Sequence, residues 1–362
     1  MASTDTAGRQ VQVLVSDTAG RQVQVLVSGI PYGFQGARPQ GRWLTSQQEA
    51  KVRSTPGIEL LHIGADDLAR TGLPSGFVPE VLFVEAGGDN DGHRKIPDIL
   101  TWECFNSLLT PRVRWIQVCS AGVEHLVHAI PDGVTLTNAS GVHANAIAEM
   151  AILAMLANAK LLRRRFEEQQ KHGYVGMPCR ELRGSTVCVV GAGNIGREVA
   201  RIAKALGMTT IGVRREARPT KGFDQVFASA NLPEALSQAD YVVLACPLTP
   251  QTFQILNADR LRHVKPGAYL INVSRGDLAD EAAMIDSLRS GQLAGAYLDA
   301  FVEEPLPETS PLWDLPTVTL TPHDAHASHL LGENQFDLFH RNLVRYMEGA
   351  ELLNVVDRAL GY

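Results

Sequence analysis

Short apolar runs alternate with amphipathic segments of helical period along most of this chain. Short runs of apolar and β-branched residues predict buried strands, whereas an apolar residue at every third or fourth position predicts a helix. In the first portion a helical pattern covers residues 97–109. The strands predicted there are 23–27, 60–63, 81–84, 115–119 and 135–138. Alternating strands and helices are typical of an α/β domain with a parallel sheet.

A second series of the same kind begins at Ser185. Its predicted strands are 186–190, 209–213, 241–245, 268–273, 295–298 and 318–321. Helical patterns lie between most of them, at 194–206, 232–238, 258–263 and 281–290. About six strands in a doubly wound order form the architecture that binds dinucleotides.

The segment between the two series, from residue 145 to about 171, has the pattern of one long helix. Its start is apolar and its end is strongly charged, so we expect a connector that is buried at one end and solvated at the other. The last helical pattern, 328–347, has no strand after it. It could return to cover the first domain.

The N-terminus contains a duplication, because residues 5–16 are repeated without change as residues 17–28. Only the second copy leads directly into the rest of the first series. We therefore expect the second copy to form the first core strand and residues 1–16 to be an appendage.

Composition narrows the classes of function. A chain of 362 residues is long for one domain and comfortable for two, and a 45% share of hydrophobic residues supplies a sizeable core. The formal net charge of −6 argues against a general nucleic-acid or anionic-membrane binder. The five cysteines are scattered and form no Cys-x-x-Cys pair, so we expect no disulfides and no metal cluster, and a reducing cytoplasm fits.

A glycine-rich turn follows the predicted strand 186–190 and precedes a helical pattern. It reads Gly-Ala-Gly-Asn-Ile-Gly, with glycines at positions 191, 193 and 196. In a strand–turn–helix context, Gly191 allows the tight turn, Gly193 lets the backbone approach a pyrophosphate, and Gly196 lets the helix pack on the strand. The helix N-terminus at Asn194 and Ile195 then offers amide groups to the phosphates. The alternative is a glycine turn needed only for packing.

Two arginines directly follow the second predicted strand of this series. A dinucleotide fold usually places an acidic residue there, which binds the ribose 2′-hydroxyl. Arg214 and Arg215 could instead bind a 2′-phosphate with charge-assisted hydrogen bonds, so we favour NADP(H) over NAD(H). The alternative is that Glu216 binds the hydroxyl and the arginines face solvent.

Reduction of a ketone by a nicotinamide needs a cation for the substrate, an acid for the developing alkoxide and a partner for that acid. Candidates of each kind follow predicted strands, at the edge where ligands bind in such sheets. Arg275 is the candidate cation and His323 the candidate acid. Glu303 and Glu304 are both candidate partners, and their spacing does not choose between them.

Other interpretations of the same residues stay open. Arg275 could form a helix-capping salt bridge with Asp277. Asp324, His326 and His329 compete with the candidate acid, and three histidines spaced by three residues could bind a metal. We expect no metal, because the segment has a proline turn and only one acidic residue.

Several of these segments together resemble the D-isomer-specific 2-hydroxyacid dehydrogenases, glyoxylate and hydroxypyruvate reductases of the NADP type among them. The likeness covers the chain from about residue 23. The arginine motif is Asn-Val-Ser-Arg-Gly-Asp at 272–277, and the glutamate motif is Leu-Asp-Ala-Phe-Val-Glu-Glu-Pro at 298–305. The other matching segments are 120–123, 142–149, 181–184, 191–196, 246–252, 310–313 and 321–323.

The resemblance implies catalytic roles for three residues. Arg275 would bind and polarise the substrate, His323 would be the acid/base, and Glu304, directly before the proline, would pair with it. Ser120, Ala121 and Gly122 would form the loop that binds the substrate carboxylate. The further cofactor contacts that it implies are Cys246, Pro247, Thr252, Val273, Ser274 and Asp299, the last at the nicotinamide carboxamide.

The implied fold has two Rossmann-like, doubly wound parallel-sheet domains with the site in the cleft between them. The first domain is discontinuous, so we expect a substrate domain at 17–146 completed by 325–362, and a dinucleotide domain at 147–324. The implied partners are a small 2-oxoacid and a second copy of the chain. Asp324 and His326 depart from the family pattern, in which small or apolar residues usually follow the histidine.

Three rival functions remain open. A relative could act on a phosphorylated hydroxyacid, for which Arg112 and Arg114 would be suited, or on phosphite. A non-catalytic, cofactor-sensing protein of the corepressor kind is the third.

Overall fold

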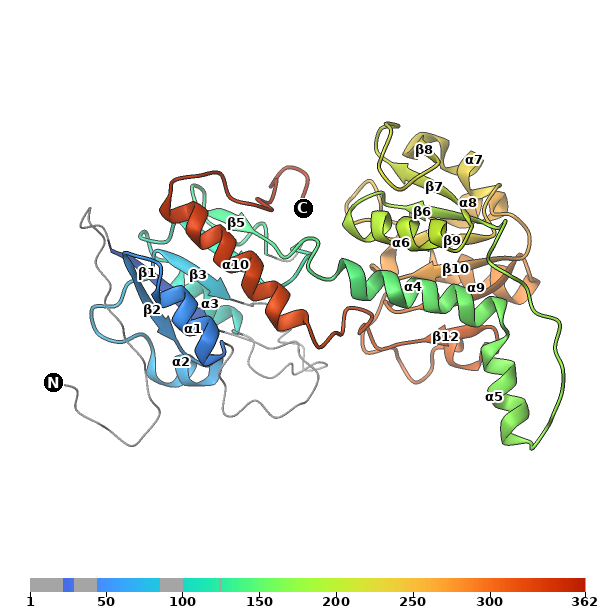
Figure 1. Ribbon diagram of the computed structural model, residues 1–362, viewed down its shortest axis with the longest axis horizontal. Helices are drawn as coiled ribbons and strands as arrows, with labels where there is room; N and C mark the ends of the chain where they lie inside the picture. Colours follow the sequence, from blue (N-terminus) through green and yellow to red (C-terminus); the bar gives the residue numbers. More distant parts are fainter. Residues whose placement is uncertain (1–21, 29–43, 85–99, 124–125, 362) are drawn as a thin grey trace. The chain divides into compact units, whose positions relative to one another are not determined.

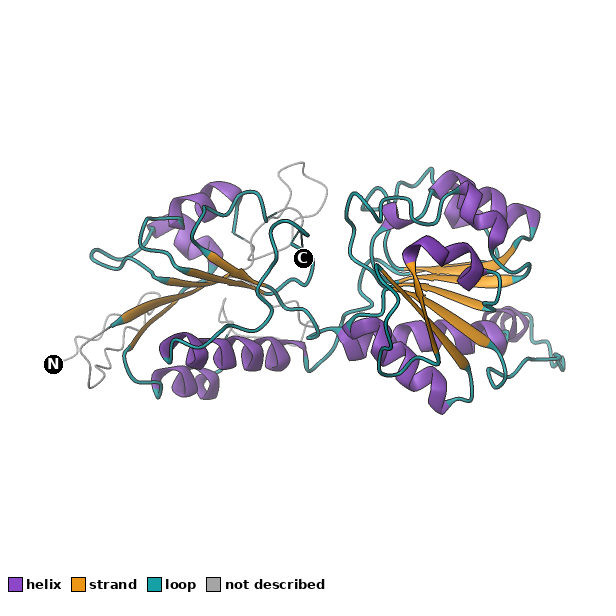
Figure 2. Cartoon of the chain, turned by 90° about the horizontal axis from the view of Figure 1, so that it is seen from above, coloured by secondary structure: helices purple, strands orange, loops and turns teal. Residues whose placement is uncertain are grey.

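The computed structural model describes residues 22–28, 44–84, 100–123 and 126–361. The chain divides into two compact units, one formed by Met1–Val142 with Ala327–Tyr362 and the other by His143–His326. Each unit contains one parallel sheet with helices on both faces, as Figures 1 and 2 show. The predicted class, two α/β domains with parallel sheets, is therefore confirmed. The expected appendage 1–16 lies outside the described residues.

The first unit contains a five-stranded sheet in the order β2-β1-β3-β4-β5. This is the flavodoxin-like order of a doubly wound sheet. Its strands are almost wholly buried, which explains why they are apolar runs without alternation. Their bounds are β1 Val23–Ser28, β2 Ile58–His62, β3 Val81–Val84, β4 Trp115–Val118 and β5 Thr135–Thr137.

In the described ranges, four helices flank this sheet: α1 Ser46–Arg53, α2 Ala65–Thr71, α3 Trp102–Leu108 and α10 Leu331–Met347. We did not predict α1 and α2, because α1 is largely polar and α2 is a short helix. A capping box formed by Thr45 and Gln48 starts α1. The C-terminal helix α10 buries Phe339 against the sheet, where its ring stacks on Phe83 at 4.2 Å and on Trp115 at 5.8 Å.

The second unit contains a seven-stranded sheet in the order β12-β11-β10-β9-β6-β7-β8. Counted from β6, this is the dinucleotide-binding order with one further strand at its end. The six predicted strands are present, and β8 was missed because it is a short, partly exposed edge strand. The bounds are β6 Thr186–Val190, β7 Thr209–Arg214, β8 Gln225–Ala228, β9 Tyr241–Leu244, β10 Ala268–Asn272, β11 Leu293–Leu298 and β12 Val318–Leu320.

The helices of this unit follow the predicted pattern except for the first. They are α4 Ala144–Ala159, α5 Leu162–Gln170, α6 Asn194–Ala205, α7 Leu232–Leu236, α8 Ala258–His263 and α9 Glu281–Ser290, with short 3-10 turns at η1 Ser229–Asn231, η2 Gly276–Leu278 and η3 Pro311–Asp314.

The prediction of one helix from residue 145 to 171 was wrong. Leu161 adopts a left-handed conformation with φ 54°, and α4 and α5 meet at an angle of 62°. The apolar α4 packs on α6 and β10, whereas α5 has no buried residue, so the change of composition coincides with the break. In the described part of the chain no single helix is long and apolar enough to cross a membrane, although this bent pair together reaches that limit.

The packing of α10 predicts the effect of Phe339→Ala. Loss of a fully buried aromatic ring leaves a cavity, so the free energy of unfolding should fall by about 3–5 kcal/mol. Urea unfolding followed by circular dichroism measures it. Phe166→Ala, on a ring that is 56% exposed in α5, is the matched control and should change stability by less than about 0.5 kcal/mol. Equal effects of the two substitutions would contradict the anchoring role of Phe339.

Candidate active site

The glycine turn after β6 is shaped by two close backbone approaches. Gly191 has φ +114°, and a Cβ there would lie 2.5 Å from the carbonyl carbon of Ala245 at the end of β9. A Cβ at Gly196 would lie 2.1 Å from the carbonyl oxygen of Gly191. At Gly193, directly before α6, a Cβ would meet nothing within 4 Å. The fold itself thus requires the outer two glycines, and the middle one leaves open space at a helix N-terminus, which fits a pyrophosphate.

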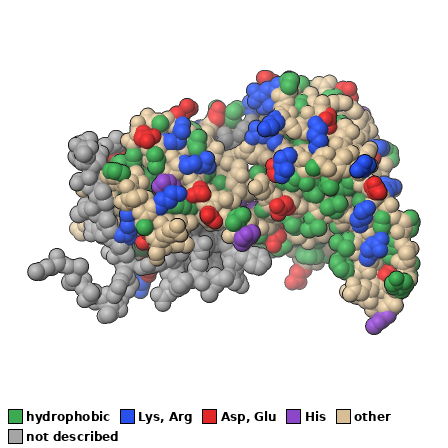
Figure 3. Space-filling view, in the orientation of Figure 1, with side chains coloured by type: hydrophobic (Ala, Val, Ile, Leu, Met, Phe, Trp, Pro, Cys, Tyr) green, Lys and Arg blue, Asp and Glu red, His purple; other side chains and the backbone are tan. Residues whose placement is uncertain are grey.

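The end of β7 lies next to this turn, because the amide of Gly191 donates to the carbonyl of Val213 at 2.9 Å. Arg214, the last residue of β7, is half-buried, and its Nη1 donates to Thr220 Oγ1 at 3.2 Å. The segment after β7 lines a cavity of about 530 Å³, which includes Arg218 and Lys221. Figure 3 shows basic side chains gathered over the end of the unit that carries β7 and β8. Sequence reasoning missed these two cations, although both lie within seven positions of Arg214.

A second turn, after β10, carries Arg275. Asn272 holds this turn with two hydrogen bonds. The Asn272 Oδ1 accepts from the Ser274 amide at 3.2 Å, and the Asn272 Nδ2 donates to the Arg275 carbonyl at 2.8 Å. A Cβ at Gly276 would lie 2.0 Å from the carbonyl carbon of Phe301. Glycine therefore lets the arginine turn pack against the loop that follows β11.

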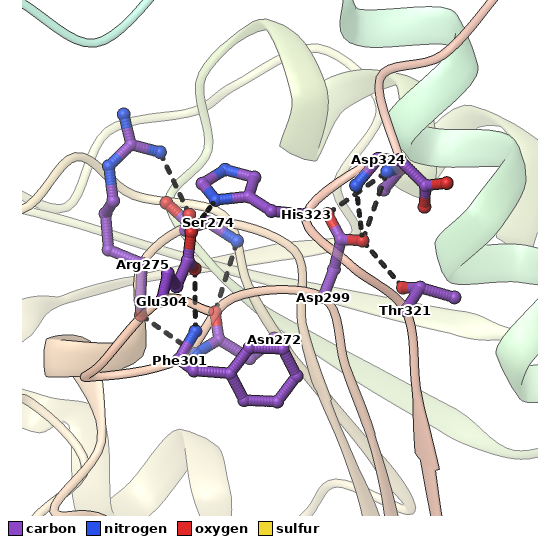
Figure 4. Close-up of polar contacts among 10 residues, drawn as sticks. Asn272, Ser274, Arg275, Asp299, Phe301, Glu304, Thr321, His323 and Asp324 are labelled. Carbon is purple, nitrogen blue, oxygen red and sulfur yellow. Dashed lines mark hydrogen bonds and ion pairs between the residues drawn. The ribbon is translucent and has the colours of Figure 1, made fainter. Parts of the chain in front are cut away.

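That loop carries Glu304, which contacts His323. His323 Nδ1 lies 2.8 Å from Glu304 Oε2, and Glu304 Oε1 accepts a hydrogen bond from the Phe301 amide at 2.9 Å. The two side chains are 29% and 26% exposed, so the pair is accessible but partly shielded from water. Figure 4 shows the Arg275 guanidinium and the His323 imidazole on the same side of the loops that carry them. Three neighbouring strands, β10 to β12, thus bring together a cation, a carboxylate and an imidazole.

Asp299, at the end of β11, organises the turn that presents His323. Its buried carboxylate accepts from Thr321 Oγ1 at 2.6 Å and from the amides of Asp324 and Ala325 at 3.0 and 3.1 Å. Burial raises the pKa of Asp299 above its usual value. These bonds flank His323, whose backbone is left-handed with φ 56°. Asp299 thus has a structural role in this turn, whereas the family resemblance implied only a contact with the nicotinamide.

The residues near His323 that could compete with it as the acid lie in different surroundings. The Asp324 carboxylate points away from the imidazole in Figure 4. The ring of His326 contacts the ring of His143 edge to face at 5.6 Å, and His329 is exposed. Among the described residues, no group of three histidine, cysteine or acidic side chains is arranged to hold a metal ion.

The loop after β9 contains further residues that the family resemblance singled out. The Cys246 carbonyl accepts from Ser274 Oγ at 2.6 Å, which ties this loop to the arginine turn. Thr252 Oγ1 donates to the Pro247 carbonyl at 2.7 Å. Val273, which directly follows β10, is buried. The loop therefore lies at the same edge of the sheet as the glycine turn.

The remaining predicted residues, Ser120, Ala121 and Gly122, belong to the first unit. They follow β4 at the carboxyl edge of its sheet. Arg112 and Arg114 lie at the opposite end of β4, before its first residue, where a second cavity of about 520 Å³ includes both.

Comparisons with known proteins agree with these motifs. The sequence profile of the D-isomer specific 2-hydroxyacid dehydrogenase NAD binding domain matches residues 150–325. A glyoxylate reductase of Thermococcus onnurineus (strain NA1) is 34% identical over 259 residues, which cover 68% of this chain and 77% of the relative.

Solved structures give the same result over more of the chain. A D-isomer specific 2-hydroxyacid dehydrogenase from Xanthobacter autotrophicus Py2, in complex with NADPH and MES, is 27% identical with a TM-score of 0.76, covering 94% of this chain and 100% of that one. An NADPH-dependent glyoxylate/hydroxypyruvate reductase from Sinorhizobium meliloti, in complex with NADP and sulfate, is 25% identical with a TM-score of 0.73 and the same coverage.

The burial of Cys246 predicts that its thiol is chemically inert, although it lies in the loop after β9. Burial raises the pKa of Cys246 and that of Cys188 in β6 to about 12, so at pH 8 only about one thiol in ten thousand is ionised. Iodoacetamide at pH 8 should therefore modify the exposed Cys179 and spare these two, as read by peptide mass spectrometry. Modification of Cys246 as fast as Cys179 in the folded protein would contradict this packing.

Proposed function

Because this chain belongs to the D-isomer specific 2-hydroxyacid dehydrogenase family, we propose that it transfers a hydride between NADP(H) and a small 2-oxoacid or D-2-hydroxyacid, with glyoxylate and hydroxypyruvate as favoured substrates. The family makes the protein an oxidoreductase that uses a nicotinamide cofactor. The observation that carries the proposal is the grouping of Arg275, Glu304 and His323 at one edge of the sheet that also carries the glycine turn.

The chemistry divides among these residues according to their atoms. When bound, NADPH supplies the hydride that reduces the substrate carbonyl carbon. Arg275 binds the substrate carboxylate and polarises the carbonyl oxygen through its planar fork of donors. Because Nδ1 of His323 contacts Glu304, its Nε2 is the nitrogen that gives a proton to this oxygen. The Glu304 carboxylate stabilises the protonated imidazole. Oxoacid, NADPH and one proton thus yield hydroxyacid and NADP⁺.

The preference for NADP(H) rests on the charge around the end of β7. Arg214 ends the strand, Arg215 follows it, and Arg218 and Lys221 line the adjoining cavity. Such a cluster of cations suits a 2′-phosphate. The NADP and NADPH complexes of similar proteins support this choice.

A small unphosphorylated substrate agrees with where Arg112 and Arg114 lie. Arg112 and Arg114 are at the amino end of β4, whereas Ser120, Ala121 and Gly122, which we propose bind the substrate carboxylate, are at its carboxyl end. The two arginines are therefore remote from the loop that a phosphorylated hydroxyacid would approach.

We also propose a homodimer. The exposed rings of Phe166 on α5 and of Tyr174 after it offer apolar surface for such an interface.

His323→Gln tests the acid. The variant keeps a similar shape but cannot protonate the alkoxide, so kcat for glyoxylate reduction should fall by about 10²–10⁴-fold. Oxidation of NADPH at 340 nm measures it, and the Kd of NADPH should be unchanged. His329→Gln, on an exposed histidine six positions further on, is the matched control and should keep full activity. Full turnover by His323→Gln would contradict the assignment of His323 as the acid.

Arg214→Asp tests the cofactor preference. A carboxylate there repels a 2′-phosphate and accepts from a 2′-hydroxyl, so the ratio of kcat/KM for NADPH over NADH should fall by at least about tenfold. Glu216→Ala is the comparison, because it should weaken use of NADH only if Glu216 is the hydroxyl ligand. An unchanged ratio in Arg214→Asp would count against the phosphate contact.

A further inference from the structure

In the turn after β4, three successive carbonyl groups accept hydrogen bonds from other parts of the protein. The carbonyls of residues 119–121 accept hydrogen bonds, in order, from Gln335 Nε2 at 3.1 Å, from the Ala139 amide at 2.8 Å and from Asn138 Nδ2 at 2.8 Å. Two of the three donors are side-chain amides, and both side chains are nearly fully buried. The orientation of each peptide in this turn is therefore fixed by a separate donor.

Fixing these carbonyls also fixes the amide groups that follow them. In a trans peptide the carbonyl of one residue and the N–H of the next point in opposite directions. The N–H groups of Ser120, Ala121 and Gly122 are therefore turned away from the donors. Within the described ranges, none of these three amides donates to a protein acceptor. The buried Ser120 Oγ likewise has no hydrogen-bond partner there. Successive unpaired amides of this kind form a nest that binds anions.

Hydrogen bonds fix Asn138, and a distant helix supplies Gln335. The Oδ1 of Asn138 accepts from the Ser140 amide at 3.1 Å, which directs its Nδ2 at the turn. The backbone of Asn138 donates to the Asn354 carbonyl at 3.2 Å, so the C-terminal segment holds it in place. Gln335 lies on α10. Elements from the end of the sequence thus hold the turn after β4.

We infer that Asn138 and Gln335 are positioning residues for the substrate carboxylate, which they serve by aiming the amides of residues 120–122. This inference rests on the proposed function, in which these amides bind the carboxylate. Neither side chain touches the reacting atoms. Loss of either donor lets one peptide rotate and weakens carboxylate binding, and the hydride step on bound substrate is left nearly unchanged.

Gln335→Met and Asn138→Leu test this role. Each keeps the approximate volume of the side chain and removes the donor, and Gln335→Met loses only one hydrogen bond, because Gln335 Oε1 has no partner among the described residues. The KM for glyoxylate should rise by about tenfold, equivalent to about 1.4 kcal/mol, with kcat within about twofold. The Kd of oxamate, an unreactive 2-oxoacid analogue, for the NADPH complex should rise equally, and the Kd of NADPH should stay constant.

Tyr346→Phe is the matched control. Tyr346 lies eleven positions after Gln335 on α10, and its hydroxyl donates to Glu80 Oε1 at 2.6 Å instead of to the turn. It should lower the melting temperature and leave the oxamate Kd unchanged. An oxamate Kd that rises equally in all three variants, or that rises in neither Gln335→Met nor Asn138→Leu, would overturn the inference.

The oxamate measurement also separates this inference from the proposed function. A wild-type protein that binds oxamate but reduces no 2-oxoacid would contradict the proposed function, while the effect of the two donors on binding would still be measured. A wild-type NADPH complex that fails to bind oxamate would overturn the amide nest itself.

Discussion

The contact between Glu304 and His323 depends on the parallel direction of the strands that precede them. β11 and β12 are paired in parallel, so the loops that follow them leave the sheet at the same edge. β10 pairs with β11 from the other side and adds Arg275 by the same rule. An antiparallel β12 would place the imidazole at the opposite edge. One constraint on strand direction therefore assembles three charged or titratable groups from loops that are far apart in sequence.

The imidazole occupies a strained position that its neighbours maintain. A left-handed conformation at a non-glycine residue costs on the order of 1 kcal/mol, and His323 adopts it at φ 56°. Asp299 offsets this strain, because its buried carboxylate accepts hydrogen bonds from both sides of the histidine. The same burial that raises the pKa of Asp299 excludes competing water from those bonds. Rigidity at this turn suits the acid role that we propose for His323, which requires a defined distance to the substrate carbonyl oxygen.

Sequence reasoning reached the strands, the glycine turn and the family resemblance because their signals are local. The resemblance is confirmed by the comparisons, and the catalytic roles that it implies remain proposals. β8 was missed as a short edge strand, and the break at Leu161 was missed because no glycine, asparagine or proline marks it. Asn138 and Gln335 were missed for another reason. Their partners lie 17 and 216 positions away, so no periodicity or spacing along the chain points to them.

The return of the chain to its first sheet has a consequence for biosynthesis. α10 and the C-terminal segment belong to the first unit, yet they leave the ribosome after the entire second unit has been made. Until then the face of the first sheet around Phe83 and Trp115 lacks the helix that covers it. The cofactor-binding unit can thus fold while translation continues, whereas the first unit is completed only once α10 has been made. A chain that stops before α10 would leave this apolar sheet face exposed to chaperones and proteases.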